Sequence, residues 1–105
     1  YEKNLVHLIK QLRKDFKAPT AKFVCASLGQ TEKGATDGGG KILDAMFAVG
    51  GKSGKYPEFK GNVATVYSHP LSKGGSSGAH YGGNAETYMN IGEAMGQAML
   101  QLLEK

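Results

Sequence analysis

The side chains of this sequence best suited to proton transfer near neutral pH are its histidines, His7, His69 and His80. His80 lies in a glycine-rich stretch, residues 78–84, directly before a long helical pattern. Histidine in such a loop is suited to general acid/base work. Spacing alone favours an ordinary structural role for each of the three. His69 precedes a proline and His7 falls on a helix surface, so neither is expected to be catalytic.

Other reactive groups fit less well. Ser27, Ser76 and Ser77 are nucleophile candidates in name only. Ser76 matches Gly-x-Ser-x-Gly within residues 74–78, but this stretch lies at the centre of a predicted loop and not at the strand-to-helix turn that presents a serine nucleophile. Cys25 is the single cysteine and sits in an apolar run, so its predicted role is packing. Residues 34–42 resemble a phosphate-binding loop, but the first glycine comes one place too early and isoleucine replaces the required serine or threonine. No metal site is expected, because metal ligands do not cluster in the sequence. No cofactor is expected either.

Composition predicts a globular protein without a nucleic-acid or membrane partner. The 105 residues are 40% apolar and 21% charged, which is ordinary for a folded domain. Thirteen Lys and Arg against nine Asp and Glu give a net charge of +4, but these cations are scattered along the chain. The cations that do cluster are Lys10, Arg13, Lys14 and Lys17, at the end of a helical pattern where they complement the helix dipole. No apolar run is long enough to span a bilayer.

Hydrophobic periodicity predicts alternating helices and strands. Leu5, Leu8, Ile9, Leu12 and Phe16 recur at helical spacing, which indicates a helix over residues 1–16 with one buried face. The remaining predicted elements are a strand over 21–28, a loop over 29–41, a short helix over 42–49, a loop over 50–61, a strand over 62–67, a loop over 68–83 and a final helix. This order predicts an α/β fold with a parallel sheet.

The final helix has the clearest signals. Asn84 is a good N-cap, and an apolar stripe runs to the end of the chain through Tyr88, Ile91, Met95, Met99 and Leu102. Gly92 and Gly96 lie four residues apart beside this stripe, and the spacing indicates close contact with a sheet or a neighbouring helix.

Two parallel strands leave both sheet edges open, so we expect the sheet to continue in residues before Tyr1 or in a partner chain. In such sheets, ligands and reactive groups gather in the loops after the carboxyl ends of the strands. The loops over 29–41 and 68–83 occupy that position, and the second one carries both His69 and His80.

The motifs His-Tyr, Asn-Ala-Glu-Thr-Tyr and Gly-x-Ala-x-Gly follow one another within residues 79–99. Together they resemble the C-terminal signature of the sialate O-acetylesterase-like branch of the SGNH hydrolases. Residues 1–14, 21–24 and 54–63 are similar to the same family, so the resemblance covers nearly the whole chain.

The resemblance implies that residues 1–105 form the C-terminal segment of a single flavodoxin-like three-layer α/β/α hydrolase domain. It implies a serine esterase that removes O-acetyl groups from sialic acid or another acetylated glycan, with His80 as general base and acid. The nucleophile and the oxyanion-binding groups of the family belong to an N-terminal part of the domain that these residues do not contain. Family habit also implies an exported parent protein.

One position departs from the family pattern. Many SGNH enzymes place an aspartate three residues before the histidine, and Ser77 stands there in this chain. Asp37 and Asp44 are the nearest preceding aspartates in sequence, but no motif connects them to His80. The alternative to an esterase fragment is a non-catalytic α/β binding or structural module that oligomerises to complete its sheet.

Overall fold

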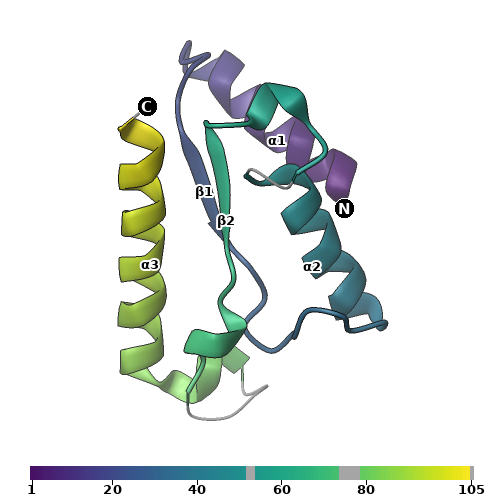
Figure 1. Ribbon diagram of the computed structural model, residues 1–105, viewed down its shortest axis with the longest axis vertical. Helices are drawn as coiled ribbons and strands as arrows, with labels where there is room; N and C mark the ends of the chain where they lie inside the picture. The colour runs from purple at the N-terminus through teal and green to yellow at the C-terminus, as the bar shows by residue number, and fades with distance from the viewer. Residues whose placement is uncertain (52–53, 74–78, 105) are drawn as a thin grey trace.

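A computed structural model describes residues 1–51, 54–73 and 79–104. Figure 1 shows helices on both sides of a short sheet. In chain order the principal elements are α1 (Glu2–Asp15), β1 (Phe23–Ala26), α2 (Gly38–Val49), β2 (Val63–Val66) and α3 (Ala85–Leu103). Short 3-10 helices lie before and after β2: η1 (Pro57–Phe59) and η2 (His69–Leu71). Before α3, η3 (Ala79–Gly83) is a turn whose inner residues have left-handed angles.

The sheet pairs β1 with β2 in parallel, with Phe23 opposite Val63 and Ala26 opposite Val66. Helices α1 and α2 lie on one side of the strands and α3 on the other (Figure 1). The predicted α/β class with a parallel sheet is therefore confirmed. Both strands end near the same end of the molecule, and the segment after β2 carries His69 and His80.

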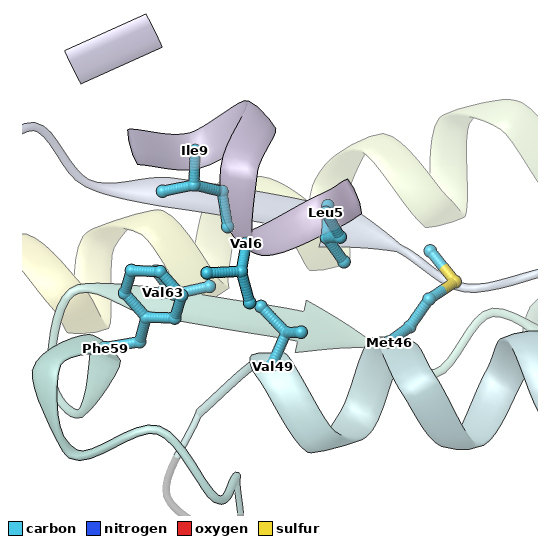
Figure 2. Packing of buried hydrophobic residues seen from close by; sticks show 7 residues of the cluster. All are labelled: Leu5, Val6, Ile9, Met46, Val49, Phe59 and Val63. Carbon is cyan, nitrogen blue, oxygen red and sulfur yellow. The ribbon is translucent and has the colours of Figure 1, made fainter. Parts of the chain in front are cut away.

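The core lies between the helix pair and β2. Figure 2 shows its buried apolar side chains pointing toward one another: Leu5, Val6, Ile9, Met46, Val49, Phe59 and Val63. Phe59 comes from η1, and Pro57 at the start of that turn fixes the backbone angle that a helical turn needs. Cys25 packs at the margin of this cluster, as the sequence predicted.

The predicted loop over 29–41 is wrong at its end, because α2 begins at Gly38. An Asp37 carboxylate oxygen accepts a hydrogen bond from the Gly40 N–H at 2.8 Å and caps the helix. Gly40 also lies so close to the Ala35 carbonyl that a Cβ atom would overlap it. This N-cap outweighs the low helix propensity of the three consecutive glycines.

The apolar stripe of α1 is only partly buried. Leu5 and Ile9 enter the core as expected and Val6 joins them, whereas Leu8, Leu12 and Phe16 remain exposed. The exposed residues recur every four positions, so they form a second apolar face on the helix. One buried face was therefore an incomplete prediction.

Helix α3 begins as predicted, because the Asn84 side chain accepts a hydrogen bond from the Thr87 N–H at 2.8 Å. Of the apolar stripe, Ile91 and Leu102 are buried. The expected close contact at Gly92 and Gly96 is wrong: a Cβ at either position would meet no described atom within 4 Å. These glycines lie on an exposed part of the helix surface. Within the described ranges, no helix has the length and apolar character to cross a membrane.

The core makes a direct prediction about stability. We expect Phe59→Ala to lower the free energy of unfolding by about 3–5 kcal/mol, because it removes a ring that is 1% exposed and leaves a cavity. The matched control is Phe16→Ala, where the ring is 77% exposed and we expect a change within about 0.5 kcal/mol. Urea unfolding followed by circular dichroism measures both. Equal losses in the two variants would contradict this assignment of the core.

Candidate functional site at the carboxyl ends of the strands

The loops after β1 and β2 are tied together where the strands end. The Ser68 N–H donates a hydrogen bond to the Ser27 hydroxyl oxygen at 2.9 Å. Both serines are buried, and their hydrogen bond extends the pairing of β1 with β2 by one further link. Ser27 therefore has a structural role, in agreement with the absence of a nucleophile motif around it. Ser76 and Ser77 lie outside the described residues.

Gly29 is the point at which the candidate site comes together. The Tyr81 ring packs against its Cα so closely that a Cβ at this position would overlap Cε1 of the ring. The Gly29 carbonyl oxygen lies 2.9 Å from Nδ1 of His69. One glycine after β1 thus contacts both the loop that follows β2 and the turn that carries His80.

His80 sits in an unusual backbone conformation. Its φ and ψ are 59° and 45°, and Tyr81 follows with φ 56°. Such left-handed angles are uncommon for residues other than glycine and require support from the surroundings. The Tyr88 hydroxyl supplies part of that support by donating a hydrogen bond to the His80 carbonyl at 2.8 Å. Strained positions of this kind occur often at functional sites.

Aromatic packing holds the same turn from a second direction. The Tyr81 and Tyr88 rings meet edge to face, with centroids 5.3 Å apart and planes at 83°. Tyr88 therefore contacts both residues of the His-Tyr pair, one through its hydroxyl group and the other through its ring. Because Tyr88 lies in the first turns of α3, the capped start of that helix positions the turn.

The loop before η3 is attached to the same helix. The Lys73 N–H donates to the Thr87 hydroxyl at 2.8 Å, and Thr87 is fully buried. The Lys73 ammonium group pairs with Glu86 at 2.8 Å. The hydrogen bond from Lys73 holds the pKa of the exposed Glu86 carboxyl below its usual value. These contacts fix Lys73, the last described residue before the histidine turn, to the first turn of α3.

The imidazole of His80 is exposed, and no described residue forms a hydrogen bond with it. Neither acid named from the sequence supplies an orienting carboxylate within the described part of the chain. Asp37 is used as the cap of α2, and Asp44 is exposed in the middle of that helix. A catalytic triad is therefore not assembled among these residues.

His69 is the histidine whose ring the structure orients. Its imidazole stacks on the Tyr67 ring, with centroids 6.2 Å apart and planes at 29°. A carbonyl oxygen only accepts hydrogen bonds, so Nδ1 of His69 must carry the proton that it shares with Gly29. In the neutral ring Nε2 is then left with a free lone pair. From the sequence His69 is not expected to be catalytic, although its position soon after a predicted strand was a usable signal.

Lys33 brings a positive charge to the same end of the sheet. Its ammonium nitrogen lies 4.5 Å from the Phe47 ring centroid and 4.7 Å from that of Tyr67. Its backbone N–H donates to the Tyr67 hydroxyl at 2.8 Å. Tyr67 thus connects Lys33 to His69, and the site contains a cation as well as two histidines.

The described residues contain no cluster of His, Cys, Asp and Glu that would hold a metal ion. Cys25 is set back in the strand, where its sulfur lies 3.3 Å from the Thr65 hydroxyl. Burial raises the pKa of this thiol, which disfavours the reactive thiolate. The chemistry that this site offers is proton transfer and hydrogen bonding by histidine.

The contact at Gly29 can be tested by adding one methyl group. We expect Gly29→Ala to displace the Tyr81 ring and the adjacent His80, because the new Cβ overlaps that ring. Two-dimensional NMR of the histidine rings should show shifted His69 and His80 resonances and an unchanged His7. The control is Gly92→Ala, where the Cβ meets nothing within 4 Å and helix propensity adds up to about 1 kcal/mol of stability. Unmoved His69 and His80 signals in Gly29→Ala would contradict the packing.

No family model, curated protein or solved structure matches this chain. The likeness to the SGNH esterases therefore rests on the motifs of the sequence itself, and the function that it implies remains a prediction.

Proposed function

We propose that this chain is part of a serine carbohydrate esterase that hydrolyses O-acetyl groups on sugars, with His80 as its general acid and base. The observation that carries the proposal is the position of the His80 turn. It packs on Gly29 at the carboxyl ends of two parallel strands, where open α/β sheets hold their reactive groups. The left-handed conformation of His80, supported by Tyr88, is the kind of strain that occurs at functional sites.

The proposed reaction has two steps. In the first, His80 takes the proton of a serine hydroxyl while the serine oxygen attacks the acetyl carbonyl, and the imidazolium then protonates the departing sugar oxygen. In the second, His80 takes a proton from the water that attacks the acetyl-serine carbonyl, and the imidazolium returns this proton to the serine oxygen as acetate leaves. The serine and the oxyanion donors would come from further strands of the same domain, since no serine among the described residues has the required setting.

The open edge of β1 supports further strands beside it. Because Phe23 and Ser27 point their N–H groups to β2, the alternate residues Val24 and Ala26 direct theirs to the other side. No described residue pairs with that edge. A largely apolar hollow of about 260 Å³ lies between α1 and the start of β1, with Leu12 and Phe16 on its wall. An additional strand would satisfy the backbone groups and cover these side chains.

The test is the loss of activity on removing the base. In the full-length protein we expect His80→Ala to lower kcat/KM for an O-acetylated sugar about a thousandfold or more, as removal of a triad histidine does. His80→Asn serves as a second variant, because asparagine tolerates left-handed backbone and keeps the turn. His7→Ala is the matched control on an exposed helix surface. Near-normal hydrolysis by both His80 variants would exclude the proposed role.

A second candidate is a non-catalytic α/β module that completes its sheet by self-association. It is favoured by the exposed apolar side chains on both outer layers, which are Leu8, Phe16, Met89, Leu100 and Leu103. A groove of about 720 Å³ also runs along β2 between α2 and the end of α3, lined in part by Val63, Thr65 and Leu102. A second copy of the chain would cover such surfaces.

Self-association predicts a mass that depends on concentration. If the module is complete in itself, we expect light scattering to report a dimer or larger species that dissociates on dilution. Phe16→Lys should shift that equilibrium toward the monomer, because it places a charge in the apolar face of α1. Thr36→Lys, at an exposed loop position before α2, is the charge-matched control. A monomer at all concentrations with cooperative unfolding would exclude this candidate.

A further inference from the structure

We propose that His69 is a substrate-binding residue of this site, whose Nε2 accepts a hydrogen bond from a free hydroxyl group of the acetylated sugar. The inference rests on the proposed esterase function and adds a residue that the sequence motifs do not include. It identifies the preferred ligand as a partly acetylated sugar, one that still carries hydroxyl donors.

The first support is the fixed state of the ring. The hydrogen bond from Nδ1 to the Gly29 carbonyl, at 2.9 Å, selects the tautomer with Nε2 unprotonated. Within the described residues Nε2 has no hydrogen-bond partner, and the side chain is only half-buried. The remaining nitrogen is thus an acceptor that a hydroxyl donor from outside the fold can satisfy.

The second support is that the ring and its backbone are held in place. The imidazole stacks on Tyr67, whose hydroxyl is itself bound by the Lys33 N–H. The backbone of His69 lies in the η2 turn, where its carbonyl accepts from the Ser72 N–H at 3.1 Å. A group fixed in this way loses little conformational entropy when it binds a ligand.

The third support is location. His69 and the turn that carries His80 both contact Gly29, one through the glycine carbonyl and the other through the Tyr81 ring beside the glycine Cα. His69 therefore lies at the same end of the sheet as the proposed base. The inference requires that a sugar whose ester reaches His80 also presents a hydroxyl group to His69.

The experiment compares substrates that differ in their hydroxyl groups. The full-length wild type and His69→Phe are assayed with 6-O-acetylglucose, which has free hydroxyls, and with glucose pentaacetate and p-nitrophenyl acetate, which have none. Phenylalanine keeps a ring for stacking on Tyr67 but has no nitrogen. We expect kcat/KM for 6-O-acetylglucose to fall about tenfold, the effect of one lost hydrogen bond, and the other two values to stay within about twofold. His69→Gln, which retains an acceptor, should recover part of the loss.

The outcomes separate the inference from the proposed function. A wild type that hydrolyses none of the three esters overturns the esterase proposal and the inference with it. The inference alone is overturned if the wild type is active and His69→Phe changes kcat/KM equally for all three substrates. The same holds if this variant leaves all three values unchanged. Uniform impairment would mark a structural role, and activity on p-nitrophenyl acetate reports whether each variant is folded.

Discussion

The close approach of the Tyr81 ring to Gly29 is the contact on which the candidate site depends. It is possible only because position 29 has no side chain, and it joins the loop after β1 to the turn before α3. The same glycine offers its carbonyl to His69, so one residue orients groups from two segments. The parallel pairing of β1 with β2 makes this possible, since it brings both strands to an end on the same side of the molecule.

The hydrogen bonds around α3 show how the turn bearing His80 is maintained against its own strain. Two successive non-glycine residues with left-handed angles carry a cost of order 1–3 kcal/mol each. Tyr88 offsets part of that cost through its hydroxyl and its ring, and Asn84 fixes the start of the helix that holds Tyr88 in place. Asn84 thus supports the conformation of His80 indirectly, through Tyr88.

The two-stranded sheet is incompletely paired and covered within the described residues. A parallel sheet is normally covered on both faces and paired along most of its length. Here no described residue pairs with the outer edge of β1, and α1 has an exposed apolar face. An additional strand beside β1 would pair with this edge and also cover the apolar face of α1. An esterase with its nucleophile on further strands and a self-associating module would both provide it, so the open edge supports additional structure without choosing between them.

The sequence alone determined the order of the elements, the parallel α/β class and the Asn84 cap, because these follow from periodicity and from contacts between near neighbours. It also predicted that the candidate site lies in the loops after the strands. It misplaced the start of α2, where the Asp37 cap outweighed three glycines, and it assigned Gly92 and Gly96 a contact that is absent from the described residues. It passed over His69, whose tautomer is set by a carbonyl 40 residues away. Only the tertiary structure decided that contact, because a hydrogen bond between distant segments leaves no periodic trace in either of them.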